Sequence, residues 1–267
     1  MAEPLSAILR NHMKEKLAAG GVVASMTVRL SRSIEIVQIA RTAGFDSIYV
    51  DLEHNTLSID TACQICIAAQ QIGLTPLVRV PANTPEYIGR VLDGGAMGVI
   101  TPHIRSAAEA RAMVDLIKFP PLGSRSAGGG LSHYGYRSYP GAEIAAAMNE
   151  ASSLVVMLET AAALDNVEEI IAVDGVDMLL VGSSDLCSEL GITGQFDHPK
   201  LRDAFARCIA AARAAGKHVG VGGLAAREDL MRQFVQMGAR YVSTGTDLAF
   251  LLGACAAKAD FVRGIAV

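Results

Sequence analysis

Leu154-Val-Val-Met-Leu-Glu-Thr160 is the stretch that decides the fold of this chain. A second run, Met178-Leu-Leu-Val-Gly-Ser-Ser-Asp185, follows it after one helical segment. Near-continuous apolar runs of this length are typical of strands that are buried on both faces, as in a parallel sheet. Each run ends at an acid, Glu159 or Asp185, and a carboxylate has no packing role at the end of a buried strand.

Two interpretations of these acids are open. An acid just after a strand can cap the next helix, and at the mouth of an α/β barrel such a residue usually belongs to the chemistry. Capping is a fair explanation of Glu159 or Asp185 taken alone. Because Mg²⁺ is usually held by one or two carboxylates plus water and substrate, the pair on successive strands favours a metal site.

The same alternation of strand and helix extends along the whole chain. We expect strands at 22–28, 47–53, 77–80, 98–101, 154–158, 177–181, 218–221 and 241–244. We expect helices at 7–18, 33–43, 59–72, 85–92, 107–118, 142–151, 166–173, 199–215, 227–237 and 248–262. Eight strands alternating with helices predict a TIM (β/α)8 barrel. An open doubly wound sheet is the alternative, but eight units exceed its usual size.

Length and composition fit one barrel domain over residues 1–267. The chain has 267 residues, 51% of them hydrophobic, and no linker or shift in composition divides it. The net charge of −4 and the lack of a basic block argue against nucleic acid or an anionic membrane as partner. Five irregularly spaced cysteines suit a reducing compartment, and the N-terminus does not resemble a signal peptide. We therefore expect a cytoplasmic protein.

One polar, glycine-rich segment, 122–140, is too long for an ordinary connection. Its Gly128-Gly-Gly130 run lacks the Lys and Ser/Thr of a phosphate-binding loop. We expect a flexible active-site loop here.

In a barrel, the residues that follow the strands share one face. Those that carry chemistry are Asp51, Glu53, His54, Arg79, His103, Glu159, Asp185 and Gly222-Gly223-Leu224. They bring a carboxylate pair, a cation and an imidazole to one mouth.

Six motifs resemble, in chain order, those of the HpcH/HpaI aldolase and citrate-lyase family. They are Val50-Asp-Leu-Glu-His54, Leu77-Val-Arg-Val80, Leu92-Asp-Gly94, Phe119-Pro-Pro-Leu-Gly-Ser-Arg125, Leu158-Glu-Thr160 and Val181-Gly-Ser-Ser-Asp-Leu186. The resemblance runs from about residue 20 to residue 260, and it is strongest to the metal-dependent pyruvate aldolases of 2-keto-3-deoxy acids. It implies a class II aldolase that reversibly cleaves a 4-hydroxy-2-oxo acid to pyruvate, or a close 2-oxoacid, and an aldehyde.

The resemblance also implies the metal and pyruvate-binding residues. Glu159 and Asp185 would bind a divalent ion, Mg²⁺, Mn²⁺ or Co²⁺, which pyruvate would chelate. Arg79 would hold and polarise the keto oxygen. The backbone N–H groups of Gly182, Ser183 and Ser184 would hold the carboxylate.

Three further assignments complete the implied site. His54, oriented by Asp51, would transfer the proton. Leu224, after the seventh strand, would contact the substrate. Asp93 would come from a neighbouring subunit, since it ends a helix far from its own barrel mouth.

The residues themselves support this chemistry. An enolate needs a sink for negative charge and a base that titrates near neutral pH, which a metal, an Arg and a His supply. The Schiff-base route needs a desolvated Lys in the site. We expect all six lysines away from the mouth, at Lys14, Lys16, Lys118, Lys200, Lys217 and Lys258.

Each assignment has a structural alternative. Arg79 could form only an ion pair and His54 could only cap a loop, whereas we expect Glu53 and His103 to support or pack the site. Leu52 replaces a glycine and Met157 a glutamine that are common in the family, so the acceptor stays open.

Other functions stay open beside the aldolase. The same enolate serves oxaloacetate decarboxylation and citrate-synthase-like condensation. A CoA-thioester lyase of the citrate lyase β type needs a basic surface that the sequence lacks. A non-catalytic 2-oxoacid-binding barrel would need no base.

The last helix predicts assembly. Residues 248–257 are apolar nearly all round, and such a helix must be buried on every side. The resemblance implies exchange of this helix between paired subunits, and three such pairs in a homohexamer.

Overall fold

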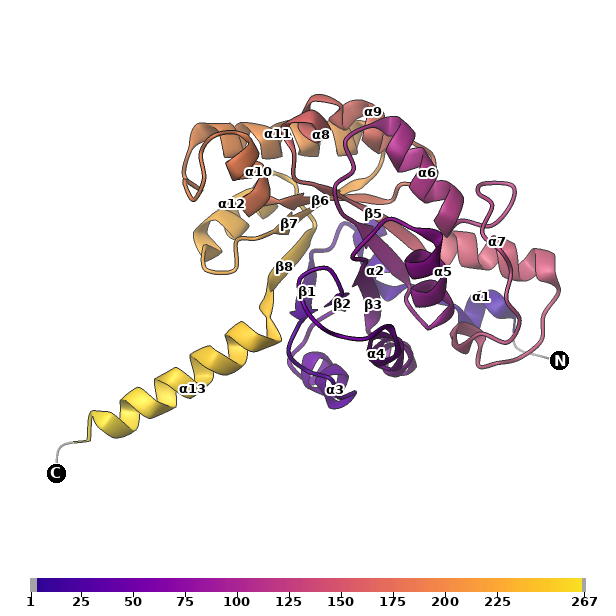
Figure 1. Cartoon of the computed structure of the whole chain (residues 1–267), viewed down its shortest axis with the longest axis horizontal. Helices are drawn as coiled ribbons and strands as arrows, with labels where there is room; N and C mark the ends of the chain where they lie inside the picture. The colour runs from indigo at the N-terminus through magenta and orange to yellow at the C-terminus, as the bar shows by residue number, and fades with distance from the viewer. Residues whose placement is uncertain (1–3, 266–267) are drawn as a thin grey trace.

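Eight parallel strands close into a barrel in chain order, and β8 pairs with β1 (Figure 1). The computed structural model describes residues 4–265, so residues 1–3 and 266–267 of the expected domain lie outside the described part. The strands are β1 Val23–Val28, β2 Ser47–Asp51, β3 Thr75–Arg79, β4 Gly98–Thr101, β5 Ser153–Leu158, β6 Met178–Gly182, β7 His218–Gly222 and β8 Tyr241–Thr246. The predicted TIM barrel is confirmed.

Helices surround the barrel, and one of them, α2 His12–Ala18, packs against the N-terminal ends of the strands. They are α1 Leu5–Ile8, α2 His12–Ala18, α3 Glu35–Thr42, α4 Ile59–Gln71, α5 Pro85–Asp93, α6 Ala107–Ile117, the 3₁₀ helix η1 Ser132–Tyr134, α7 Gly141–Ala151, α8 Ala161–Asp165, α9 Val167–Ala172, α10 Ser183–Glu189, α11 Pro199–Ala214, α12 Glu228–Met237 and α13 Asp247–Arg263. The predicted helix 7–18 is divided, because the Asn11 side chain caps α2 by accepting from Lys14 N. The predictions missed η1, α8 and α10.

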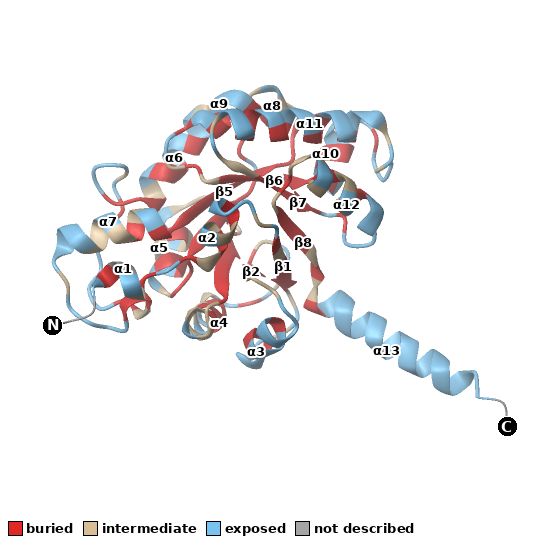
Figure 2. Cartoon of the chain, turned by 180° about the vertical axis from the view of Figure 1, so that it is seen from behind, coloured by how far each residue is buried: buried red, intermediate tan, exposed pale blue. Residues whose placement is uncertain are grey.

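The strands are buried on both faces, as their apolar runs predict (Figure 2). Inside the barrel, Tyr49, Leu77, Val155 and Tyr241 pack together with Met13 of α2, which closes the N-terminal ends of the strands. A larger apolar layer lies between the strands and the surrounding helices. The C-terminal ends of the strands therefore form the mouth that remains for a ligand.

Strand register fixes which residues meet at that mouth. In the β2–β3 pair Asp51 lies opposite Arg79, and in the β6–β7 pair Gly182 lies opposite Gly222. Acidic and cationic groups that are distant in sequence thus lie side by side at the C-terminal ends of the strands.

Segment 122–140 lies at the other end of the barrel, so it is not a loop over this chain's own mouth. Tyr134 is fully buried against α1 and α7, and His133 Nε2 is 3.1 Å from the carbonyl oxygen of Ala96, which precedes β4. The apolar side chains Leu131 and Tyr134 of this glycine-rich stretch are buried. The expectation that the stretch is an active-site loop over the mouth of the same chain is wrong.

Helix α13 extends away from the barrel (Figures 1 and 2). Its large apolar side chains are exposed, among them Leu252 at 66% and Phe261 at 68%, whereas Asp247 at its first turn is buried. The helix is apolar all round, as predicted, but the single chain does not cover it. Within residues 4–265 no helix is long and apolar enough to cross a membrane.

Candidate active site

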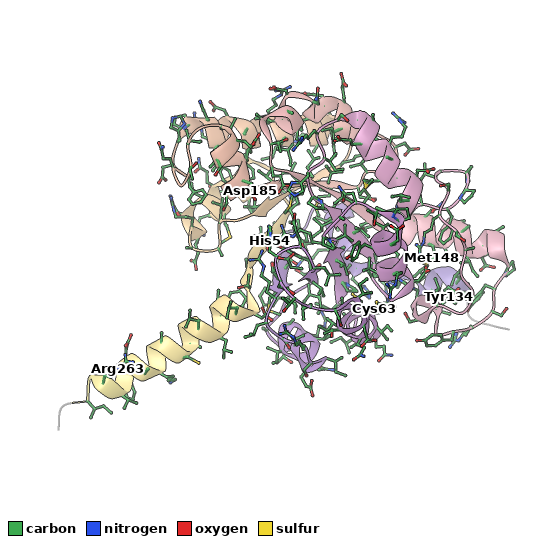
Figure 3. The ribbon with its side chains drawn as sticks, viewed as in Figure 1. His54, Cys63, Tyr134, Met148, Asp185 and Arg263 are labelled. Atoms are coloured by element: carbon green, nitrogen blue, oxygen red, sulfur yellow. The ribbon has the colours of Figure 1, made fainter. Side chains whose placement is uncertain are left out.

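A cavity of about 280 Å³ opens at the C-terminal mouth of the barrel. It is lined by Arg29, Tyr49, His54, Arg79, Met157, Leu180, Gly182, Ser184, Asp185, Gly222 and Gly223. Five of the predicted site residues, His54, Arg79, Gly182, Ser184 and Asp185, therefore line one space. Figure 3 shows His54 and Asp185 near the centre of the barrel and Tyr134 well away from them.

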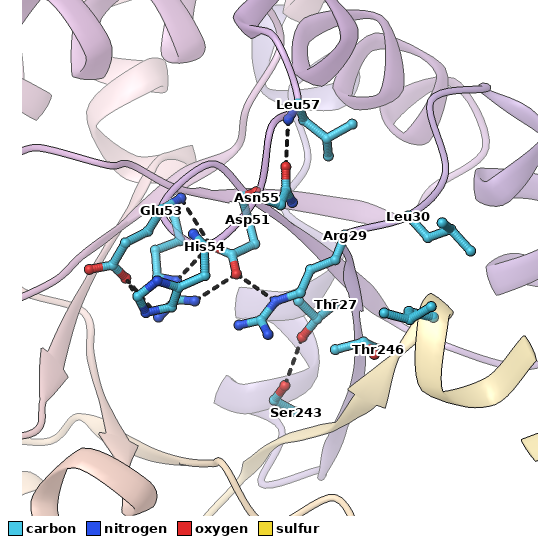
Figure 4. A network of polar contacts seen from close by, with 12 residues as sticks. Thr27, Arg29, Leu30, Asp51, Glu53, His54, Asn55, Leu57, Ser243 and Thr246 are labelled. Atoms are coloured by element: carbon cyan, nitrogen blue, oxygen red, sulfur yellow. Dashed lines mark hydrogen bonds and ion pairs between the residues drawn. The ribbon is translucent and has the colours of Figure 1, made fainter. Parts of the chain in front are cut away.

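Asp51 is the buried anchor of this mouth. Its carboxylate accepts from Arg79 Nε at 2.9 Å and Nη2 at 2.6 Å, and from Arg29 Nε at 2.7 Å (Figure 4). It also accepts the backbone N–H groups of Glu53 and His54 at 3.1 and 3.3 Å. Among the described residues its contact to His54 is through the backbone, so the expectation that Asp51 orients the imidazole is corrected: Asp51 orients the Arg79 guanidinium.

Asp51 and Arg79 each stabilise the ionised form of the other. Burial alone would raise the pKa of Asp51, but the Arg79 hydrogen bonds and the charges of Arg79 and Arg29 outweigh it and lower that pKa. Burial opposes the charge on Arg79 in turn, yet bonding to Asp51 and the neighbouring negative charges leave its pKa raised. Arg79 is 3% exposed, so it presents a permanent cation in a dry pocket.

His54 carries the exposed imidazole of the site. Its side chain is 57% exposed, and Nε2 lies 3.7 Å from Glu53 Oε2. Glu53 Oε2 also lies 2.8 Å from Arg79 Nη1. Glu53 therefore links the imidazole and the guanidinium, which agrees with the supporting role expected for it.

Glu159 does not cap a helix. The N-terminus of α8 is capped by Thr160, whose Oγ1 accepts from Ala163 N at 3.1 Å. Glu159 is 3% exposed, and its Oε1 accepts the backbone N–H of His103 at 2.8 Å. Asp185 lies in the first turn of α10 and lines the cavity. The capping interpretation thus fails for Glu159.

The two acids suit a divalent cation. Burial raises the pKa of Glu159, and the charges of Glu53 and Asp185 raise it further against the contacts of His103. A positive ion beside Glu159 and Asp185 would relieve this repulsion. Residues 4–265 contain no group of three or more His, Cys, Asp or Glu placed to hold a metal. Two protein carboxylates with water and substrate are nevertheless a usual Mg²⁺ site.

The start of α10 offers a place for a carboxylate. The first N–H groups of a helix have no partner within it. Gly223, with φ +78°, lies over them, since a Cβ there would be 3.3 Å from Ser184 N and 3.4 Å from Ser183 N. The Oγ of Ser183 is buried and has no hydrogen-bond partner among residues 4–265. A glycine thus keeps open the space in front of the first N–H groups of α10.

Two expected pocket residues point elsewhere. Leu224 is 2% exposed and packs in the layer between strands and helices, so its side chain does not contact the cavity. Leu52 lies in the same layer. The seventh connection reaches the cavity through Gly222 and Gly223 instead. Met157 does line the cavity, with its sulfur 3.6 Å from Arg79 Nη1.

Sequence reasoning missed Arg29, and it placed His103 at the mouth without predicting its contacts. Arg29 directly follows β1, and this strand-end position was the available signal. His103 was expected to pack or support, but its side chain is 63% exposed and bridges two acids, with Nδ1 2.8 Å from Glu159 Oε1 and Nε2 3.0 Å from Glu53 Oε1. Its φ of +59° directs it there, and no sequence pattern showed this.

Asp93 lies outside this mouth. It ends α5, and its Oδ1 accepts from Arg125 Nη2 at 2.6 Å. None of the six lysines, all of which the structure describes, lines the cavity, as expected.

Comparison with known proteins identifies the family of this chain. Residues 26–254 match the HpcH/HpaI aldolase/citrate lyase family. A 4-hydroxy-4-methyl-2-oxoglutarate aldolase of Chaetomium globosum is 44% identical over 80% of each chain. A 4-hydroxy-2-oxo-heptane-1,7-dioate aldolase of Salmonella typhimurium is 32% identical over 95% of each chain.

A solved structure gives the same result for the fold. The HpcH/HpaI aldolase of Desulfitobacterium hafniense superposes with a TM-score of 0.89 at 31% identity, covering 95% of this chain and 97% of its own. The chain therefore belongs to the HpcH/HpaI aldolase/citrate lyase family.

Proposed function

We propose that this enzyme reversibly cleaves 4-hydroxy-2-oxo acids to pyruvate, or a close 2-oxoacid, and an aldehyde, using a divalent ion at Glu159 and Asp185. Membership of the family makes it an aldolase, a carbon–carbon lyase. The observation that carries the proposal is one cavity that holds a buried guanidinium, an exposed imidazole and the carboxylate of Asp185 in the first turn of α10.

Arg79 stabilises the charge that develops on the substrate. When the C3–C4 bond breaks, its electron pair moves onto the 2-oxo group and makes an enolate. A fixed cation in a dry site stabilises such a charge without reorganisation. Asp51 accepts from Nε and Nη2 of Arg79, and Nη1 faces Glu53 and Met157. The second N–H group of Nη2 is not used in these contacts and is the donor proposed for the keto oxygen.

His54 moves the proton. It takes the proton of the C4 hydroxyl as the aldehyde carbonyl forms, and a proton returned to C3 of the enolate completes pyruvate. An imidazole titrates near neutral pH and suits both directions. Its exposed ring is accessible to substrate from the mouth.

The remaining groups bind and orient the substrate. Glu159 and Asp185 would hold Mg²⁺, Mn²⁺ or Co²⁺, which supplies a Lewis acid for negative charge on oxygen. The N–H groups of Ser183 and Ser184 would accept the 2-oxoacid carboxylate in the space that Gly223 keeps open.

Alternative reactions use the same groups. Oxaloacetate decarboxylation or a citrate-synthase-like condensation would also need Arg79 and the metal. Cleavage of a 4-hydroxy-2-oxo acid needs a base for the C4 hydroxyl, which His54 would provide, whereas decarboxylation has no such hydroxyl and a non-catalytic binding barrel needs no base. A condensation would also use proton transfer, and the similarity to aldolases of 4-hydroxy-2-oxo acids argues against it. The imidazole in the cavity therefore favours the aldolase reaction.

A coupled assay tests the proposal. Pyruvate release from a panel of 4-hydroxy-2-oxo acids is measured with lactate dehydrogenase after chelation and again after adding Mg²⁺, Mn²⁺ or Co²⁺. We expect release only with metal, and loss of it in Glu159→Gln and Asp185→Asn variants. Full activity after exhaustive chelation, or a borohydride-trapped Lys adduct, would contradict the metal route.

We further propose a homo-oligomer, a hexamer, with exchanged α13 helices and with Asp93 acting in a neighbouring site. Two features support it. The apolar surface of α13 is uncovered in one chain and would favour aggregation if it stayed exposed. Asp93 ends α5 and pairs with Arg125, and it does not line the cavity of its own barrel, so a role in catalysis would require the site of another subunit.

Mixing inactive variants tests the shared site. Asp93→Ala and His54→Ala proteins are each expected to assemble and to be inactive. Dissociated and reassembled together, they would form some sites with an intact His54 from one subunit and an intact Asp93 from another, and activity would return. Light scattering that shows a fully active 28.0 kDa monomer would exclude both parts of this proposal.

A further inference from the structure

Arg29 is a guanidinium in the mouth to which the proposed reaction assigns no task. It follows β1, lines the same cavity as Arg79 and His54, and its side chain is 33% exposed, against 4% for the side chain of Arg79. Arg79 therefore lies at the bottom of the mouth and Arg29 nearer to solvent. Both guanidinium groups border the one cavity that a substrate at Arg79 would occupy.

The backbone of Arg29 is rigidly held. The Asp247 carboxylate accepts the N–H of Arg29 at 2.9 Å and that of Ser31 at 2.8 Å. The N–H of Leu30 lies 3.0 Å from each of its two oxygens. Asp247 is itself 7% exposed at the start of α13. Three backbone donors on one buried carboxylate fix the point from which the Arg29 side chain leaves the barrel.

The guanidinium is held at one nitrogen only. Arg29 Nε donates to Asp51 Oδ2 at 2.7 Å (Figure 4). Nη1 and Nη2 donate no hydrogen bond to any group in residues 4–265, and they are not among the buried atoms that lack a partner. The side chain thus presents a fixed, accessible pair of donors. Two parallel N–H groups match the geometry of a carboxylate or another oxyanion.

The other charged groups of the mouth have partners of their own, so Nη1 and Nη2 of Arg29 stay available for a ligand. Arg79 is matched by Asp51 and Glu53, and the proposed divalent ion by Glu159 and Asp185. The 2-oxoacid carboxylate has the amide donors at Ser183 and Ser184. A second anionic group on the substrate would have Arg29 as its partner.

We infer that Arg29 recognises an anionic group at the distal end of the substrate, so that the preferred substrates are 4-hydroxy-2-oxo acids with a second carboxylate or comparable oxyanion. This inference rests on the proposed aldolase function. Arg29 is a specificity residue in it: it binds the acceptor half and takes no part in proton transfer or in breaking the C3–C4 bond.

Matched substrates test the inference on the metal-loaded enzyme. One pair is 4-hydroxy-2-oxopentanedioate and 4-hydroxy-2-oxopentanoate, and a longer pair is 4-hydroxy-2-oxoheptanedioate and 4-hydroxy-2-oxoheptanoate. Within each pair only the distal carboxylate differs. The measured quantity is the ratio of kcat/KM for the diacid to kcat/KM for the monoacid, from pyruvate release.

In the wild type we expect a ratio above one for at least one pair. Arg29→Leu should lower that ratio roughly tenfold to a hundredfold, mainly through KM of the diacid, because hydrogen bonds to charged groups are worth that much. Arg29→Lys should give an intermediate ratio, since an ammonium keeps the charge and loses the fork. Arg32→Leu is the matched control: Arg32 is exposed three residues along, donates to Leu30 O and Thr56 Oγ1, and should leave the ratio unchanged.

The outcomes separate this inference from the proposed function. If no compound of either pair yields pyruvate, the proposed function fails. If all are cleaved and Arg29→Leu lowers diacid and monoacid equally, Arg29 acts only by positioning Asp51 and Arg79, and the inference is overturned. A wild-type ratio of one or less in both pairs would overturn it as well.

Discussion

Replacing Asp51 by Asn would remove the charge on which both arginines of the mouth depend. Asp51 is fully buried and bonds Arg79 twice and Arg29 once. Asn has nearly the same shape, but its amide group turns an N–H donor toward guanidinium donors. Removing one partner of a buried ion pair costs about 3–5 kcal/mol of stability. Glu53, 2.8 Å from Arg79 Nη1, remains as a partner, so we expect the lower figure.

The effect should appear in both stability and catalysis. A loss of about 3 kcal/mol corresponds to a Tm lower by roughly 6–12 °C in a chain of this size. A guanidinium displaced by about 1 Å would lower kcat about a hundredfold. Thermal denaturation and the lactate dehydrogenase assay measure the two effects on the same preparation.

An exposed pair of the same geometry is the control. Glu168 accepts from Arg207 Nε at 2.9 Å and from Nη2 at 2.8 Å, but both side chains are at the surface. Glu168→Gln should lower stability by less than about 1 kcal/mol, because solvent screens the pair. If Asp51→Asn keeps the wild-type Tm and turnover, Asp51 does not hold Arg79 in place and the reasoning about the anchor is refuted.

Three further outcomes are expected. His54→Ala should lower aldol cleavage by about 10²–10⁴-fold, as for a general base, while calorimetric Mn²⁺ affinity stays near wild type; unchanged cleavage would remove His54 from the mechanism. Gly223→Ala should raise KM for pyruvate in the condensation direction by about tenfold, since its Cβ would meet Ser184 N at 3.3 Å, whereas Gly216→Ala, with similar φ and nothing within 4 Å, should show only a loss of stability. Burial, reinforced by Arg125, lowers the pKa of His133 from 6.5 to about 4, so the unfolded chain binds a proton in that window that the folded chain does not; stability should fall from pH 6.5 to pH 4, and His133→Gln should reduce this fall by roughly 3 kcal/mol in denaturant titrations, with equal pH slopes as the contradicting result.

The sequence by itself determined the barrel and most of the strand-end chemistry. Buried parallel strands need apolar side chains on both faces, so the runs at 154–158 and 178–181 could be recognised locally. Once eight strands close, their C-terminal ends share one mouth, and this places Arg79, Glu159 and Asp185 together without further information.

Only the tertiary structure decided which of these groups touch. Asp51 and His54 are close in sequence, yet the register of β2 and β3 sets the carboxylate against Arg79. A positive φ brings His103 between two acids, and no pattern in the sequence marks a single residue of that kind.

The placement of segments also depended on packing between distant parts. Segment 122–140 looked like a loop over the mouth, but Tyr134 is buried against α1 and α7 at the opposite end. Leu224 looked like a pocket residue, but it belongs to the layer under the helices. Arg29 is a candidate specificity residue because its Nε donates to Asp51 of another strand, a contact that the sequence does not show. Contacts between residues far apart in the chain have no local signature, and in this enzyme they complete the site.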